Sequence, residues 1–345
     1  MKFTINNNDF REGLKIVSKA VPKRTTIDAL RGVLIKALEN CVELNAFDMG
    51  THIQISVPAS IEEEGSSLVP FAELFGFVSK STKEIDVEDH GNYILLTSSG
   101  EIKLNTYPLK DYPPLPPIPE DFTCQVFNLK DKIKNTVFLT TLDASDYRSG
   151  VFFGNNRVIA YDGNYRVGSV SCDLDINPML IPSKLLYNMI TWDNAYIQED
   201  GRRVYFKKDN IVLSSPRINY PFPKMENMFL VEYKINIYLD RELLLKICET
   251  ANSINQKTFV LNIRENIVEV TAKSEIGFFK EIILLDEVVS DNISLSLKPQ
   301  DIISLLKGLS DIEEGIVLHV NEPRKMIKFS SGNYEYLTMP QVSII

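Results

Sequence analysis

The chain has 345 residues, which is too long for one ordinary hydrophobic core and suits two or three domains. Its apolar content of 44% and charged content of 24% are ordinary for a globular protein. The net charge of −9, taken alone, argues mildly against a nucleic-acid partner.

Cysteine spacing and the first residues exclude further classes. Cys41, Cys124, Cys172 and Cys248 lie far apart without a C-x-x-C pair, which argues against a zinc site or a disulfide framework and suits a reducing cytosol. The opening stretch MKFTINNNDFREGLK lacks the apolar segment of a signal peptide, and no apolar run approaches the roughly 20 residues of a membrane span. We therefore expect a cytoplasmic protein with no membrane partner.

An amphipathic helix is predicted near the start of each third of the chain. Apolar residues recur every three or four positions in 7–21, and the same period is found in 129–139 and 240–254. Each of these segments is therefore expected to bury one face.

A hairpin is predicted after each of these helices, in 33–48, 150–162 and 259–273, where two alternating strands flank a short polar turn. The predicted turns are Glu39-Asn40, Asn155-Asn156 and Glu265-Asn266. Asparagine tolerates the positive φ that tight hairpin turns need.

A third pattern places a proline between a short apolar strand and an amphipathic run. It occurs in SLVPFAEL (67–74), MLIPSKLL (179–186) and LSLKPQDII (295–303). Proline in the first turn of a helix loses no hydrogen bond, because that N–H is unpaired anyway. Pro70, Pro182 and Pro299 are therefore each predicted to open a helix.

A closing element also recurs, in 102–119, 211–225 and 327–341. Four patterns thus return in the same order about every 115 residues, which indicates internal repetition. We interpret the chain as three tandem copies of one α+β unit, each with two helices and several antiparallel strands. The predicted domains are 1–119, 120–234 and 235–345. The alternative is three unrelated α+β domains with similar turns.

The predicted helices are more basic than the rest of this acidic chain. Arg11, Lys15 and Lys19 are four residues apart and form one stripe, and Lys130 and Lys134 repeat that spacing. Segregated charge of this kind would draw a polyanion to the helical side. The alternative is that these are ordinary solvated helix faces.

The stretch AYDGNYRVGSV at 160–170 raises the question whether Asp162 is a catalytic acid. His52, His90 and His319 belong to no catalytic or metal-ligand motif, and the chain has no G-x-x-x-x-G-K-[ST] loop for a nucleotide. We predict that the protein is not an enzyme and has no metal site.

Six motifs, in this order, carry a resemblance to a known family. They are MKFTI…GLKIVSKAVPKRT, the LNAFD hairpin, LVPFAELF, AYDGNYRV, LIPSKLL and the terminal YLTMP. Along its whole length the sequence resembles the bacterial DNA polymerase III β subunit, the sliding clamp. The resemblance implies an α+β fold of three tandem clamp-type domains, with two helices packed on antiparallel sheet in each, forming half of a closed ring.

The resemblance also implies a function. A homodimer of the family closes head to tail around double-stranded DNA, which it holds independently of sequence. It tethers the replicative polymerase and so gives processivity in DNA replication. It is a non-catalytic subunit of the polymerase holoenzyme, needs no cofactor, and receives the polymerase and the clamp loader through short peptide motifs.

The family's peptide pocket lies between its second and third domains. Carried over by position, the pocket residues here are Tyr161, Gly163, Val167, Leu337, Met339 and Pro340. Four departures from the family imply a reshaped pocket: one extra residue within 164–167, Gln341-Val342 after the Met-Pro pair, the absence of the arginine usual before SGVFF, and Arg148 at a normally apolar place.

The resemblance suggests DNA contacts as well. PKRTT matches the family's loop after the first helix, which makes Arg24 the first candidate, and IPSK places Lys184 at a contact position. The full candidate set is Arg24, Lys23, Arg11, Lys15, Lys19, Lys184 and Tyr147. Tyr147 reads equally well as a core or strand residue. The competing interpretation of the whole chain is a repeat-built protein-binding scaffold that does not encircle DNA.

Overall fold

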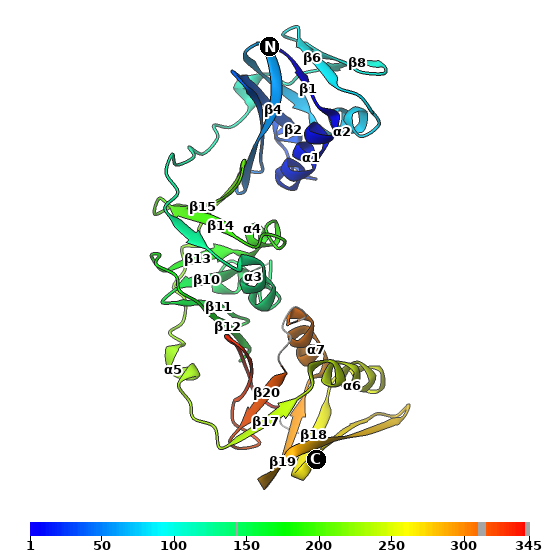
Figure 1. Ribbon diagram of the computed structural model, residues 1–345, viewed down its shortest axis with the longest axis vertical. Coiled ribbons are helices and arrows are strands. Elements are labelled where there is room, and N and C mark those ends of the chain that lie inside the picture. The colour runs from blue at the N-terminus through cyan, green and yellow to red at the C-terminus, as the bar shows by residue number, and fades with distance from the viewer. Residues whose placement is uncertain (143, 310–314, 342–345) are drawn as a thin grey trace. The chain divides into compact units, whose positions relative to one another are not determined.

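The structure, a computed structural model, describes residues 1–142, 144–309 and 315–341. It forms two compact units, shown in Figure 1: Met1–Phe127 with Asn194–Arg217, and Asn128–Asp193 with Ile218–Ile345. No helix within the described residues combines the length and the apolarity needed to cross a membrane.

The order of elements repeats along the chain. The first set is β1 (Lys2–Ile5), α1 (Asn7–Val17), β2 (Gly32–Leu38), β3 (Cys41–Phe47), β4 (His52–Glu63), β5 (Gly65–Pro70), α2 (Phe71–Val78), β6 (Ile85–Asp89), β7 (Tyr93–Thr97) and β8 (Glu101–Asn105). The second set is β9 (Cys124–Val126), α3 (Leu129–Val137), β10 (Gly150–Gly154), β11 (Arg157–Tyr161), β12 (Val167–Ser171), β13 (Met179–Pro182), α4 (Ser183–Tyr187), β14 (Ala195–Glu199), β15 (Arg203–Lys208) and β16 (Ile211–Pro216).

Residues 217–234, which we call the connector, contain the short helix α5 (Glu226–Phe229) and lead to the third set. This set is β17 (Ile235–Leu239), α6 (Arg241–Ile254), β18 (Phe259–Lys273), β19 (Phe278–Leu297), α7 (Pro299–Gly308), β20 (Ile316–Val320), β21 (Ile327–Ser331) and β22 (Tyr334–Thr338). The prediction of three tandem copies of one α+β unit is confirmed. We call these copies the first, second and third repeat.

Local chemistry explains where the helices begin. The Asn6 side chain accepts the backbone N–H of Asn8 at 2.9 Å to start α1, and the Asp240 side chain accepts that of Leu243 at 2.6 Å to start α6. Pro299 opens α7 from its first turn, as predicted. Pro70 and Pro182 instead stand at the cap position, one residue before α2 and α4.

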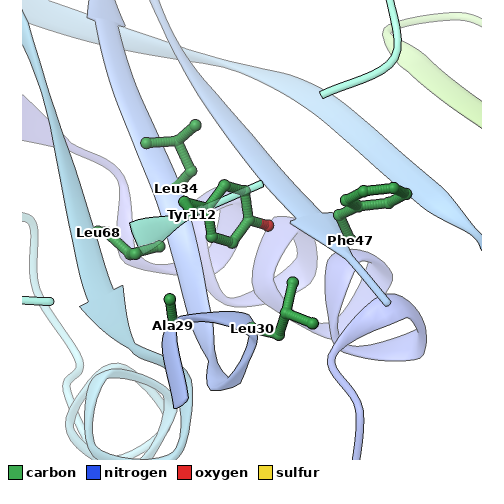
Figure 2. Packing of buried hydrophobic residues seen from close by; sticks show 6 residues of the cluster. All are labelled: Ala29, Leu30, Leu34, Phe47, Leu68 and Tyr112. Carbon is green, nitrogen blue, oxygen red and sulfur yellow. The ribbon is translucent and has the colours of Figure 1, made fainter. Parts of the chain in front are cut away.

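The first unit is built on a 12-stranded sheet, as counted over the described residues, whose main path runs β8-β7-β6-β1-β4-β16-β15-β14-β9. The first part of β4 also pairs with β3, which leads on to β2 and β5. Helices α1 and α2 lie side by side (Figure 1). The predicted apolar face of α1 is buried, and Gly13 lets the helix approach the sheet, because an added Cβ would come within 2.9 Å of Leu44. Figure 2 shows a second part of this core, formed by Ala29, Leu30, Leu34, Phe47, Leu68 and Tyr112.

The second unit holds an 8-stranded sheet, again over the described residues, in the order β13-β10-β11-β12-β22-β21-β20-β17. Strands β12 and β22 join the second repeat to the third and run antiparallel, with Val167 opposite Leu337. Strands β18 and β19 form a separate two-stranded sheet. Helices α6 and α7 lie side by side (Figure 1).

Two of the three predicted hairpins are present. Strands β2 and β3 form the first, with Leu38 opposite Cys41 across the turn Glu39-Asn40. Strands β10 and β11 form a hairpin whose turn residues Asn155 and Asn156 have φ of 53° and 56°. The hairpin predicted for 259–273 is wrong, because this segment is the single strand β18 and pairs with β19 along its length. Glu265 has a φ of 48° and coincides with a shift in register. A positive φ at a register shift is typical of a bulge within a continuous strand.

Candidate functional site

Asp162 stabilises the turn between β11 and β12. Its carboxylate accepts the backbone N–H groups of Asn164 at 2.7 Å and Arg166 at 3.0 Å, and the Nε of Arg166 at 2.6 Å. The guanidinium of Arg166 also pairs with Asp301 on α7, which ties the turn to a helix of the third repeat. Asp162 is therefore a structural anchor, with a side chain that is only 6% exposed.

An apolar cluster lies beside this turn. Its buried members come from β11, β12 and β22 and from the connector, and we call it the connector cluster: Ile159, Val167, Met225, Phe229 and Leu337. Partly buried side chains that pack against it are Phe152, Tyr161, Phe222, Met228 and Met326. Val167 and Leu337 have no exposed surface, since Met225 and Phe229 pack with them in the same cluster.

Charged residues fix the connector to the sheet. Arg157 on β11 donates to Glu335 on β22 at 2.8 Å, and its guanidinium lies 4.5 Å from the ring centre of Phe229. Lys328 on β21 donates to the other carboxylate oxygen of Glu335 at 3.0 Å. Burial works to raise the pKa of Glu335, but the hydrogen bonds from Arg157 and Lys328 outweigh it and hold this pKa below its usual value. The carboxylate therefore links three strands in its ionised form.

Aromatic side chains extend the connector cluster toward solvent. Tyr147 stacks on Tyr161 with ring centres 5.6 Å apart, and also contacts Tyr220 and Phe222. Phe222 in turn stacks on Phe152 at 4.9 Å. We call these five residues the aromatic cluster. Tyr161, Phe152 and Phe222 belong to it and also pack against the connector cluster, so the two surfaces are continuous.

Arg148 lies at the edge of the aromatic cluster. It follows Tyr147 in a single 3-10 turn, Tyr147–Ser149, and pairs with Asp146 at 2.9 Å. The aliphatic part of the Arg148 side chain packs against Gly163, where an added Cβ would lie 2.9 Å from the Arg148 Cδ. Gly163 also has a φ of 81°, so this place requires glycine for both reasons.

The structure brings together four of the six residues predicted for the peptide pocket. Tyr161, Val167 and Leu337 meet at the connector cluster, and Gly163 lies next to Arg148 and Tyr147. Met339 and Pro340 follow β22 and belong to neither cluster. The next residue, Gln341, donates its backbone N–H to the carbonyl of Ser296 on β19 at 2.7 Å. Val342 lies outside the described residues.

The predicted DNA contacts fall in both compact units. Arg11 and Lys15 are on α1, Lys19 is in the 3-10 turn that follows, and Lys23 and Arg24 are exposed in the next loop. Lys15 pairs with Glu12 at 2.6 Å, and Arg11 donates to Asn8 at 3.2 Å.

The other two candidates are in the second unit. Lys184 is exposed on α4, whereas Tyr147 is a member of the aromatic cluster. Among the described residues, no group of three or more His, Cys, Asp or Glu side chains is arranged to hold a metal ion.

Sequence reasoning missed the contribution of the connector. Met225 and Phe229 are buried against the predicted pocket residues Val167 and Leu337. The guanidinium of Arg157, on β11, lies over the Phe229 ring. The segment MENMF at 225–229 carries a usable signal, because apolar residues at positions i, i+3 and i+4 share one face of a helical turn. Its short length and its place between repeats concealed that signal.

Comparisons with known proteins agree with this architecture. Residues 1–116 match the family model described as DNA polymerase III beta subunit, N-terminal domain. The beta sliding clamp of Bacillus subtilis (strain 168) is 26% identical over 351 residues, covering 91% of this chain and 92% of the relative. That of Halalkalibacterium halodurans is 27% identical over 342 residues, covering 89% and 90%.

Solved structures show the same fold. The beta subunit of DNA polymerase from Streptococcus pyogenes matches with a TM-score of 0.91 at 20% identity, over 99% of this chain and 100% of that chain. The sliding clamp from Bacillus subtilis matches with a TM-score of 0.90 at 23% identity, over 99% of both chains. Because the sequence relatives and the fold agree along nearly the whole chain, the protein belongs to the beta sliding clamp family, the DNA polymerase III beta subunits, as a divergent member.

Proposed function

We propose that two copies of this chain pair head to tail into a ring around double-stranded DNA. As a sliding clamp, the protein serves processivity in DNA replication and is a non-catalytic accessory subunit of the polymerase. The proposal adds how the ring closes and how its partners dock. The observation that carries it is a rule of strand pairing that the chain follows twice.

The rule concerns the junctions between repeats. The first part of β4 pairs with β16, the last strand of the second repeat, from Ile55 opposite Ile211 to His52 opposite Ser214. The corresponding strand of the second repeat, β12, pairs with β22, the last strand of the third repeat. The first and the second repeat thus each extend a sheet with the last strand of the repeat that follows.

Continuing the rule requires a second copy. The corresponding strand of the third repeat is β19, and the last strand of the first repeat is β8. Within the described residues, β8 pairs only with β7, and β19 pairs only with β18. Open edges offer unpaired backbone groups to another chain. The apolar side chains of Phe278, Ile282 and Leu284 on β19 are 61%, 48% and 75% exposed. Pairing β19 with β8 of a second copy would use both edges and close a two-fold ring.

DNA binding is proposed for the basic surface of the first repeat. Lys23 and Arg24 are exposed in one loop, next to the helical stripe that Arg11, Lys15 and Lys19 follow. Contacts from long cationic side chains to phosphates attract DNA without reading its sequence, so they permit sliding.

Peptide docking is proposed at the connector and aromatic clusters. The partly exposed aromatic cluster continues into the connector cluster, which is buried beneath Met225 and Phe229. A short peptide with apolar anchors fits this place when those two side chains move aside. The polymerase and the clamp loader would carry such peptides.

The test combines sedimentation equilibrium with DNA retention. We expect a mass of two chains at micromolar concentration, and retention on circular duplex DNA but loss from linear DNA through its free ends. A monomer that stays on neither form would favour the protein-binding scaffold. Equal retention on both forms would show binding without encirclement.

A further inference from the structure

Arg148, at the edge of the aromatic cluster, uses only one edge of its guanidinium for hydrogen bonds to Asp146. Asp146 accepts from Nε of Arg148 at 3.0 Å and from Nη2 at 2.9 Å. The edge formed by Nη1 and the second hydrogen of Nη2 has no acceptor in the part of the chain that the structure describes, and the side chain is 44% exposed. That edge has the fork geometry that matches a carboxylate in a bidentate pair.

Asp146 and Gly163 position this fork. Asp146 accepts the backbone N–H of Arg148 at 2.9 Å as well as its side chain, so one carboxylate holds both parts of the arginine. The hydrogen bond from Arg148 holds the pKa of Asp146 below its usual value. Gly163 leaves room for the stem, since any larger residue would meet Cδ. An arginine held on one edge loses little further freedom when the other edge binds a ligand.

Two tyrosines lie near this arginine. The hydroxyl of Tyr147 and the Cδ of Arg148 are both close to Gly163, at 3.6 Å and 2.9 Å from the place where a Gly163 Cβ would be, and the ring centre of Tyr220 is 6.0 Å from that of Tyr147. Tyr220 is 47% exposed. Phenol hydroxyls can donate to an anion, so both tyrosines can add donors to those of the guanidinium.

We propose that the free edge of Arg148, with the hydroxyls of Tyr147 and Tyr220, binds a carboxylate of the docking peptide, so that this clamp prefers partner peptides with an acidic residue beside their apolar motif. The inference rests on the proposed docking of peptides at the two clusters. It assigns Arg148 as a residue that determines which peptides are selected.

A peptide carboxylate fits this place better than a DNA phosphate. Asp146 pairs with the arginine and Asp162 lies in the adjoining turn, and both carboxylates would repel a chain of phosphates. A single carboxylate next to apolar residues can bind the guanidinium while its neighbours cover Tyr161 and the connector cluster. Stabilising the fold is a weak reason for an arginine at position 148, because an exposed ion pair such as Arg148–Asp146 contributes less than about 1 kcal/mol to the free energy of unfolding.

The test is titration calorimetry of the full-length protein with paired peptides. All share one glutamine-led apolar motif and carry a single glutamate at successive positions on either side of it, and each has a twin with glutamine in that place. We expect at least one glutamate peptide to bind about tenfold more tightly than its twin. Arg148→Leu should abolish the preference, and Arg148→Lys should lose most of it, because lysine has charge but no fork. Arg264→Leu removes the same charge from β18 and should keep the preference.

The outcomes separate the two proposals. Equal binding of every pair to the wild-type protein overturns the role of Arg148 and leaves peptide docking intact. Binding of no peptide at all overturns the docking proposal and this inference with it. If no pair discriminates and Arg148→Leu instead weakens binding of single-stranded or duplex DNA, the guanidinium contacts phosphate and the peptide inference is wrong.

Discussion

At the scale of single residues, Asp162 shows how a carboxylate in a promising stretch can be structural. It accepts two backbone N–H groups of its own turn and pairs with Arg166, which reaches α7. A carboxylate engaged in this way has little capacity left for a substrate, and its environment explains why aspartate is found there.

Replacing this carboxylate should weaken the fold. We expect Asp162→Asn to lower the free energy of unfolding by about 1–2 kcal/mol, because the charged partner of Arg166 is lost while the backbone acceptor remains. Urea denaturation measures the change. Asp175→Asn, at an exposed position, should have no effect beyond error. Equal stability of Asp162→Asn and wild type would contradict the anchoring role.

Arg24 is the residue at which DNA binding is tested. We expect Arg24→Ala to weaken binding of all duplex sequences alike and to make the salt dependence slightly shallower, because one phosphate contact is lost. Fluorescence anisotropy at several salt concentrations measures both. Lys110→Ala removes an exposed lysine outside the proposed surface and serves as the control. A loss confined to one DNA sequence would remove Arg24 from the set.

At the scale of elements, the connector covers the place where a peptide is proposed to dock. Phe229 and Met225 pack with Val167 and Leu337, and Arg157 lies against the Phe229 ring. A peptide that uses Val167 or Leu337 must displace these side chains, so the apparent affinity is reduced by the fraction of time in which the connector is closed.

Phe229→Ala should therefore act in two opposite directions. We expect peptide affinity to rise by up to about tenfold, because the competing ring is gone. The free energy of unfolding should fall by about 3 kcal/mol, because a buried aromatic ring is removed. Calorimetry and urea denaturation give the two values. Leu230→Ala, at a neighbouring residue that is 75% exposed, should change neither. Lower peptide affinity in Phe229→Ala would mean that the ring supports the peptide.

The ion pairs of Glu335 make part of the stability depend on pH. The pKa of Glu335 is lower in the folded protein than in the unfolded chain, so its contribution is fully present above its usual value of 4.5 and is lost as pH falls through the lowered value. We expect wild type to lose more stability than Glu335→Gln between neutral pH and pH values below that range. Parallel urea denaturation series measure the difference, and identical pH profiles would refute it.

At the scale of the whole molecule, ring closure depends on two strand edges. Lysine on an edge strand discourages pairing with another chain. We expect Ile282→Lys on β19 to shift the protein toward monomer by at least about tenfold in dissociation constant, and the effect enters twice because a two-copy ring contains the junction twice. Sedimentation equilibrium measures it. Ile276→Lys, in the turn before β19 and 82% exposed, is the matched control. An unchanged dimer in Ile282→Lys would place the interface elsewhere.

The sequence by itself determined the features that depend on neighbouring residues. Helical periodicity buries Phe10, Leu14 and Val17, and Asn155-Asn156 supplies the two positive φ angles of a tight turn. The repeated order of such signals predicts three copies of one α+β unit, and the motifs within them identify the family. Arg148 and the turn at 162–167 were also visible in sequence as departures from that family.

Only the tertiary structure decided what depends on segments far apart in the chain. Residues 259–273 carry a hairpin pattern, yet they form one strand, because they pair with β19 along their whole length and Glu265 lies at a register shift within that strand. Met225 and Phe229 reach Val167 and Leu337 because the connector folds back over the sheet. Whether Arg148 is paired on one edge and open on the other depends on the positions of Asp146 and Gly163 in space. Periodicity and turn chemistry act over a few residues, whereas burial and pairing depend on which distant residues come into contact.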